Sequence, residues 1–262
     1  MRRRWYTDAV TRSTGLLVVG LVIAAWFTLA PAYVSELRFP SPAATLRSIN
    51  ALGDTLLINS RATLVRVLTG WFIGCLGGVV VGLMMTRSPF VERSLNPLLE
   101  IARPLPPVAL VPFFILWFGV GASGQIVLIA LSCFMVLAVT TFSAARLVPT
   151  IYVQTAASLG ASPARIYRTV VLPAIIPAIA AGCRVSAALA FGVGVAAEFM
   201  GAQSGLGYMM MVARRTLNTD TILVGLLALG VESFAFDSLL RIVTRRITRW
   251  ADSPMSETIA AI

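Results

Sequence analysis

The chain has 262 residues, of which 58% are hydrophobic and only 12% are charged, and its formal net charge is +10. The charged fraction is about half that of a soluble domain, and several apolar runs reach the ~20 residues that one helix needs to cross a bilayer. We therefore exclude an ordinary soluble domain and predict an all-α polytopic membrane protein in contact with the lipid bilayer.

The missing residue types exclude several kinds of enzyme. All 21 basic residues are arginine, because the sequence contains neither lysine nor histidine. A Walker A loop needs its lysine to reach the phosphates of ATP. Without histidine, a Ser-His-Asp triad, an H-E-x-x-H zinc site and a histidine general base cannot form. We therefore predict no catalytic residue, no metal site and no cofactor in this chain; if its work needs ATP and Mg²⁺, a partner subunit must bind them.

The positive charge and the cysteines have simple explanations in a membrane protein. A net charge of +10 can indicate a nucleic-acid partner, but arginine collects in the cytoplasmic loops of membrane proteins, so we expect no nucleic acid to bind. Cys75, Cys133 and Cys183 lie far apart within apolar runs. Their spacing indicates buried small side chains rather than a metal cluster or a disulfide framework.

The N-terminal part begins with a predicted cytoplasmic tail at 1–14, which carries four arginines, and the uncharged run Gly15–Val34 follows it. A secretory signal is one interpretation, because the Ala-Pro-Ala at 30–32 loosely imitates a cleavage site, but proline is unfavourable there and further apolar runs follow. We interpret the run as the first span and residues 35–61 as an external loop with a short amphipathic helix. Together they form one predicted segment, 15–61.

A second span is predicted at about Val67–Thr86. It contains four glycines spaced by four residues, which lie on one face of a helix: Gly70, Gly74, Gly78 and Gly82. Chance can scatter glycines, but here the spacing repeats three times. Such a face lets another helix approach closely, so we predict that it packs against a neighbouring span.

The stretch between Arg103 and Arg146 contains 42 uncharged residues. One helix of that length would be about 63 Å long, about twice the hydrocarbon thickness. We therefore predict a third and a fourth span joined by a turn at "GVGASG", 119–124. The stretch begins with "RPLPPVALVP", whose four prolines cannot form a regular helix, and irregular backbone at membrane depth requires cover from protein or water.

A fifth span is predicted at about Pro173–Glu198 and a sixth at about Thr221–Arg241, which gives a transmembrane core at 62–245. Six spans place both termini in the cytoplasm. The tail at 246–262 follows an arginine-rich end, in agreement with the positive-inside rule. External segments also hold arginines, so the bias is not absolute: Arg38, Arg47, Arg214 and Arg215.

A polar segment at 146–172 then lies between the fourth and fifth spans, on the cytoplasmic side. Within it, "PTIYVQTAASLG" predicts a short helix that ends at Gly160, and Ser162 with Pro163 predicts a second helix start. Small side chains around the bend leave room for close packing: Ala156, Ala157 and Ala161. This local pattern fits a docking elbow and an ordinary loop equally well.

The same segment resembles the "EAA" loop of permease subunits of binding-protein-dependent ABC transporters. In that loop a Glu-Ala-Ala triplet is followed by glycine and, after nine more residues, by Ile-x-Leu-Pro. Here Gln154-Thr155-Ala156 stands at the triplet, Gly160 at the glycine and Val170-Val171-Leu172-Pro173 at the end, with the same spacing. Glutamate is replaced by Gln154, which keeps a hydrogen-bonding amide, and the first alanine is replaced by Thr155.

Three further segments are similar to the taurine, sulfonate and nitrate branch of this family: "TLVRVLTGWF" (63–72), "RPLPPVALVPFFILWFGVG" (103–121) and "AAEFMGAQSGLGYMM" (196–210). With the elbow they cover about residues 60–250 in the expected order. The resemblance implies the fold of a type I ABC importer permease, which is all-α, with about six transmembrane helices and a cytoplasmic coupling helix.

The resemblance also implies partners and a function. Two ATPase subunits, a second permease copy as a homodimer and an external solute-binding protein would complete the importer in a bacterial inner membrane. This chain would not be an enzyme; it would form the path for a small organic anion, taurine or another alkanesulfonate, with nitrate, bicarbonate or a thiamine-precursor pyrimidine as alternatives. A coupling loop at about 150–172 would contact the ATPase through these residues: Gln154, Thr155, Ala156, Ala157, Leu159, Gly160, Ala161 and Ser162.

Charged residues inside spans are the predicted path residues, since each costs about 2.5–3.5 kcal/mol in a bilayer and is usually paired or functional. Arg66 begins the second span, Arg184 interrupts the fifth and Glu198 ends it. One interpretation places them on the path of an anion. The other pairs each of them with a neighbouring helix for structural reasons, and we expect the same of Glu232, with an arginine as its partner.

Two functions from other classes remain open. A membrane enzyme would need polar side chains gathered in a cleft, and without histidine and lysine few are available. A self-contained secondary transporter would need an inverted repeat with matching broken segments. The prolines at 104–112 correspond loosely to Pro173 and Pro177, but that interpretation gives the elbow no role.

Overall fold

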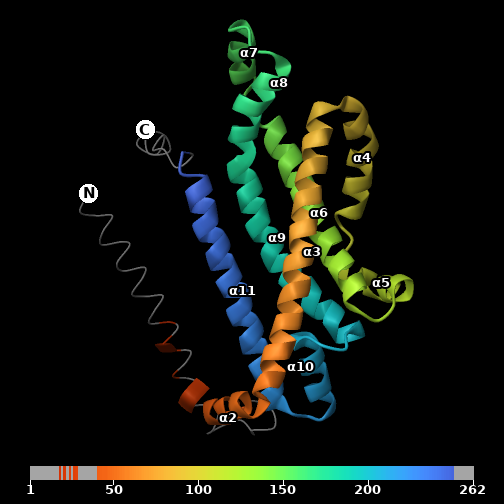
Figure 1. Cartoon of the computed structure of the whole chain (residues 1–262), viewed down its shortest axis with the longest axis vertical. Coiled ribbons are helices and arrows are strands. Elements are labelled where there is room, and N and C mark those ends of the chain that lie inside the picture. Colours follow the sequence, from red (N-terminus) through yellow and green to blue (C-terminus); the bar gives the residue numbers. More distant parts are fainter. Residues whose placement is uncertain (1–17, 19, 22–23, 25, 29–39, 251–262) are drawn as a thin grey trace, which may run out of the picture.

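The computed structural model describes residues 18, 20–21, 24, 26–28 and 40–250, and this part of the chain contains helices and no strand (Figure 1). The predicted first span at Gly15–Val34 lies largely outside these residues, as does most of the tail at 246–262. The elements from Pro42 on are α2 (Pro42–Leu52), α3 (Asp54–Arg87), α4 (Pro89–Ala102), η1 (Pro107–Leu110), α5 (Val111–Phe118), α6 (Ala122–Arg146), α7 (Thr150–Ser158), α8 (Pro163–Ile166), η2 (Tyr167–Val171), α9 (Leu172–Gly201), α10 (Leu206–Arg215) and α11 (Thr219–Ile247).

Four helices in the described part are long and apolar enough to span a membrane, and they run side by side along the molecule (Figure 1). They are α3, α6, the rod Pro163–Gly201 that contains α9, and α11. A fifth span exists if α4 and the helix at Pro107–Phe118, which are bent by 90°, are counted as one broken span. The all-α membrane fold is thus confirmed, with four to five spans in the described residues.

The third span differs from its prediction. The irregular backbone predicted after Arg103 is present, but the broken span begins earlier than predicted, because it includes α4, which ends at Ala102 before a helical turn resumes at Pro107. The proline ring locks φ and removes an N–H donor, so the prolines of 104–107 cannot continue the backbone hydrogen bonding of α4. The predicted turn after this segment is present, and Gly119 there has a φ of 73°, which favours glycine.

The second span is longer than predicted. Its helix α3 has 34 residues and begins at Asp54, so residues 54–61 belong to this helix rather than to an external loop. The short helix predicted in the preceding segment is α2, whose first turn is capped by Ser41 and contains Pro42. The apolar run marked only the membrane-embedded part of α3, so its polar first turns were wrongly assigned to the external loop.

The core forms where α3, α6 and α9 meet, around buried residues such as Val67, Ile129 and Ala190. The predicted glycine face of α3 lies against α6. A β-carbon added to Gly70, Gly78 or Gly82 would come within 2.7–2.8 Å of a β-carbon on α6. The two backbones therefore approach as closely as glycine alone permits.

Candidate functional site

The elbow consists of α7, the bend at Gly160 and α8, and it protrudes at one end of the molecule (Figure 1). All of the predicted coupling residues lie on α7 or in this bend. No residue of α7 is buried. Because α7 has no fully buried residue, its position depends mainly on the segments that join its two ends.

The backbone around Gly160 explains how α7 ends. Gly160 has a φ of 80°, the left-handed conformation. Its N–H donates to the carbonyl of Ala157 at 2.9 Å, and the N–H of Ala161 donates to the carbonyl of Ala156 at 3.1 Å. These two bonds make a Schellman motif, which satisfies carbonyls that the end of a helix leaves free.

The chain restarts two residues after the glycine. Ser162 is extended, and its hydroxyl accepts a hydrogen bond from the N–H of Arg165, while Pro163 occupies the first position of α8. The structure therefore contains the two short helices and the sharp bend that the sequence predicts.

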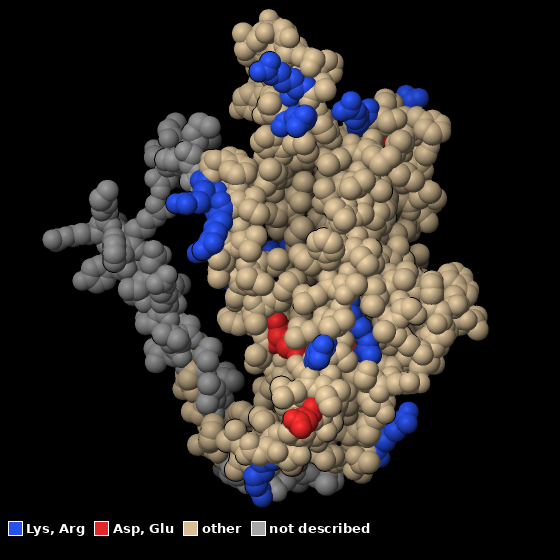
Figure 2. All heavy atoms as spheres, viewed as in Figure 1, with Lys and Arg blue, Asp and Glu red and all other residues tan. Residues whose placement is uncertain are grey.

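The surface of the elbow is apolar with a basic margin. Leu159 is 84% exposed, Ile151 60% and Tyr152 57%. Beside the bend, Arg165 and Arg168 line a shallow hollow, and Figure 2 shows arginine side chains around this end of the molecule. Exposed apolar side chains on a protruding polar loop are typical of a protein-docking surface rather than of a simple connection.

A buried polar cluster lies at the opposite end, where α10 begins (Figure 1). The first N–H groups of a helix have no partner within it. Here the N–H groups of 205–207 donate, in chain order, to Asn59 Oδ1, Thr63 Oγ1 and Glu198 Oε2, each at 2.8 Å. Side chains of α3 and α9 thus cap a third helix.

Arg66 balances the carboxylate at this cap. Its Nη1 lies 3.0 Å from Glu198 Oε1, with Arg66 9% and Glu198 2% exposed. The same guanidinium donates to the carbonyl and hydroxyl of Ser204 at 2.7 and 2.6 Å. The hydroxyl of Thr63 lies 2.9 and 3.0 Å from the two Glu198 oxygens. We call Asn59, Thr63, Arg66, Glu198 and Ser204 the α10 clasp.

The clasp explains the Gly-Leu-Gly sequence at 205–207. Gly205 has a φ of 115°, which side chains rarely adopt. A β-carbon on Gly207 would lie 2.7 Å from the β-carbon of Glu198. The carboxylate can therefore reach the start of α10 only because both positions lack a side chain.

Sequence reasoning named Arg66 and Glu198 but missed the other members of the clasp. The available signal was the spacing of Asn59, Thr63 and Arg66 at i, i+4 and i+7, which places three polar side chains on one face of an otherwise apolar helix. Their acceptor and donor partners come from distant parts of the chain, and no spacing within α3 identifies them.

Arg184 has a separate partner. Its guanidinium makes a two-point contact with Asp237 of α11, at 2.9–3.1 Å, and Asp237 also pairs with Arg241 one turn away. Both Arg184 and Asp237 are about one-third exposed. Each predicted path residue thus has an oppositely charged partner on another helix, and a role on the path stays a prediction for all three.

The expected partner of Glu232 was wrong. Among the described residues, Glu232 forms no ion pair with an arginine; it accepts a hydrogen bond from the hydroxyl of Ser60 on α3. Ser60 and Glu232 are 172 residues apart in the sequence, which explains why the sequence suggested no partner. No group of three or more His, Cys, Asp and Glu side chains that could hold a metal lies within the described residues, and the absence of a metal site and of a cofactor stays a prediction.

Comparisons with known proteins agree on one family. Residues 76–249 match the family model described as the binding-protein-dependent transport system inner membrane component. The chain is 34% identical over 259 residues to the taurine transport system permease protein TauC of Escherichia coli (strain K12), covering 95% of this chain and 94% of that protein. It is 31% identical to a protein of Bacillus subtilis (strain 168) named provisionally as the aliphatic sulfonates transport permease SsuC, covering 91% and 88%.

Solved structures show the same fold at lower identity. One chain of the MetNI methionine ABC transporter in an inward-facing conformation is 21% identical, with a TM-score of 0.59, covering 74% of this chain and 99% of that chain. A chain of an amino acid ABC transporter solved with histidines is 18% identical, with a TM-score of 0.61, covering 76% and 97%.

Proposed function

The chain belongs to the family of binding-protein-dependent transport system inner membrane components, and from this premise we propose that it is the permease subunit of an ATP-driven importer. Membership makes it a multi-pass membrane component rather than a catalytic subunit. ATP and Mg²⁺ are bound by two separate ATPase subunits. A second copy of the chain completes the translocation path, and an external binding protein delivers the substrate.

The elbow is the observation that carries this proposal. Helix α7 has no buried residue and ends at a glycine, and the capped helix α8 follows it directly. The elbow therefore presents exposed apolar side chains away from the rest of the molecule. Such a feature suits insertion into a cleft of another subunit. The chain has no lysine for a P-loop of its own, so force must reach it through a contact of this kind.

The elbow also orients the molecule. We assign the elbow end to the cytoplasm, and both termini with it. Several arginines lie at the ends of spans on this side, which supports the assignment by the positive-inside rule: Arg87, Arg146, Arg165, Arg168, Arg245 and Arg246.

The substrate we propose is a small organic anion, either taurine or another alkanesulfonate. TauC and SsuC carry these substrates in their names, and the chain spans about nine-tenths of both proteins. Nitrate, bicarbonate and a thiamine-precursor pyrimidine are the alternatives. The measurement is uptake of labelled taurine into proteoliposomes that contain this chain and its ATPase, with the binding protein outside and ATP inside. Uptake by the chain alone, insensitive to ATP depletion, would instead make it a secondary transporter.

Gly160→Asp is expected to abolish co-purification of the ATPase while the membrane fold stays intact. Aspartate adds strain at a φ of 80° and a negative charge in the bend, yet its β-carbon meets no atom within 4 Å. Pull-down from detergent measures the ATPase, and size-exclusion chromatography measures the fold.

Gly119→Asp is the matched control. Gly119 also has a positive φ, of 73°, and open space around its β-carbon, but it lies at the turn before α6. This variant is expected to retain the ATPase. Equal retention by both variants would contradict docking at the elbow.

A further inference from the structure

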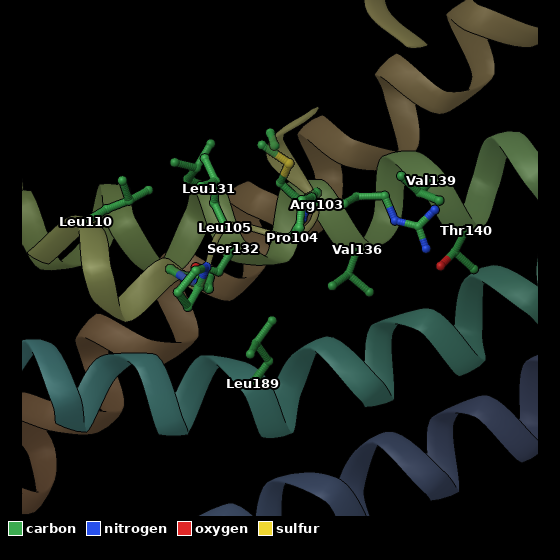
Figure 3. A pocket seen from close by; sticks show the side chains of 14 residues that line it. Arg103, Pro104, Leu105, Leu110, Leu131, Ser132, Val136, Val139, Thr140 and Leu189 are labelled. Atoms are coloured by element: carbon green, nitrogen blue, oxygen red, sulfur yellow. The ribbon is translucent and has the colours of Figure 1, made fainter. Parts of the chain in front are cut away.

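A cavity of about 610 Å³ opens beside the break in the third span (Figure 3). It is walled by the proline-rich segment at 103–107, by α6 and by one residue of α9, Leu189. Most of its lining is aliphatic. The polar side chains among its lining residues are those of Arg103, Ser132 and Thr140.

The cavity lies at membrane depth. Helix α6 has 25 residues and is therefore about 37 Å long, which exceeds the ~30 Å of hydrocarbon. Ser132 lies near the middle of this helix, and Thr140 is about 9 Å from its cytoplasmic end. Figure 3 shows the guanidinium of Arg103 beside Val139 and Thr140.

The guanidinium of Arg103 has no ion pair and no hydrogen bond within the described part of the chain. Glu100 shares a second cavity with it, but Glu100 accepts a hydrogen bond from Asn96 and no ion pair with Arg103 forms. Arg66 and Arg184 differ, since their charges are matched by Glu198 and Asp237.

An unpaired charge at this depth is expensive unless it faces water or an anion. A guanidinium offers several N–H donors in a planar fork, which suits the oxygens of a sulfonate. The aliphatic wall suits the short hydrocarbon part of the same molecule. Discontinuous helices form the substrate sites of many transporters, and Arg103 lies at the break of such a span.

We propose that this cavity is a binding site on the translocation path and that Arg103 receives the sulfonate group of the substrate there. The proposal rests on the proposed function for its ligand, an alkanesulfonate. It assigns the anion-binding role to Arg103 and leaves Arg66 and Arg184 as structural partners of their carboxylates. The alternative is that the side chain of Arg103 extends to the cytoplasmic surface and binds lipid phosphates there.

Arg103→Gln tests the charge in the reconstituted importer. Sulfonate uptake is expected to fall at least about tenfold, because the lost charge-assisted hydrogen bonds are worth that factor. ATP hydrolysis stimulated by the loaded binding protein is expected to persist, since the docking surfaces are untouched. Arg103→Lys is expected to recover part of the uptake. Arg93→Gln removes the same charge from α4 outside both cavities and is expected to leave uptake unchanged.

Val136→Phe tests the cavity without touching the arginine. Val136 points into the cavity from α6 (Figure 3), so a phenyl ring there fills part of it and is expected to lower uptake with the ATPase still bound. Normal uptake by Arg103→Gln or by Val136→Phe overturns the proposal. A parallel loss of uptake and ATP hydrolysis also overturns the proposal, because it indicates that Arg103 supports assembly of the importer or binds lipid phosphates. A wild-type importer that moves no sulfonate refutes the proposed substrate instead.

Discussion

Glu198→Leu is expected to lower the free energy of unfolding by about 3–5 kcal/mol, because it leaves the buried guanidinium of Arg66 without its counter-charge. The substitution also removes the acceptor of the Thr63 hydroxyl and of the Gly207 N–H. The start of α10 then loses part of its cap. Thermal unfolding of the purified chain in detergent, followed by tryptophan fluorescence, measures the loss.

A double-mutant cycle separates the ion pair from the packing around it. Arg66→Met combined with Glu198→Leu removes both buried charges, so the pair of substitutions is expected to cost less than the sum of the two single changes, by about 1 kcal/mol or more. Asp237→Asn is the control, since its partner Arg184 is one-third exposed and the expected cost is at most about 1 kcal/mol. A Glu198→Leu loss no larger than the control would mean that the clasp does not hold α10.

The elbow could be predicted from sequence because every signal that builds it is local. The glycine that takes a positive φ, the carbonyls that it caps and the Ser-Pro restart all lie within about ten residues of one another. Short-range rules of capping decide such a feature, and the surrounding tertiary structure did not override them. What the elbow contacts is not local, and the family resemblance supplied that part of the hypothesis.

The α10 clasp could not be predicted in the same way. Thr63 and Glu198 are 135 residues apart, and Thr63 and Leu206 are 143 apart. A charged residue in an apolar run indicates that a partner exists, but the approach of three helices decides which partner it is. The sequence therefore identified Arg66, Arg184 and Glu198 as unusual without identifying Arg66 and Glu198 as each other's partners.

The start of the third span was predicted wrongly for a different reason. The four prolines correctly predicted irregular backbone, yet the apolar run was counted from the last charged residue, Arg103. In the structure Arg103 lies within the broken span, because α4, which precedes Arg103 in the sequence, forms the first part of that span. Charge is a poor marker of a span boundary where an arginine faces a cavity, and the guanidinium of Arg103 has no ion-pair partner among the described residues.

Gly78→Ala is expected to destabilise the chain whereas Gly77→Ala is not, although the two substitutions add the same methyl group to adjacent residues of α3. A β-carbon at Gly78 would lie 2.6 Å from the carbonyl oxygen of Phe134 and 2.7 Å from Leu137 Cβ, so α6 must move away. Overpacking of this kind costs about 1–3 kcal/mol and more where backbone is involved. Thermal unfolding in detergent measures both variants.

At Gly77 the nearest atom to an added β-carbon is Phe134 Cδ2 at 3.5 Å, an ordinary contact. Alanine is favoured over glycine inside a helix by about 1 kcal/mol, so Gly77→Ala is expected to be neutral or stabilising. Because α6 also forms a wall of the Arg103 cavity, the Gly78 variant is expected to lose uptake together with stability. Equal destabilisation by the two variants would indicate that α3 tolerates no added volume on either face, and the close approach of α6 would then not be what the glycine spacing provides.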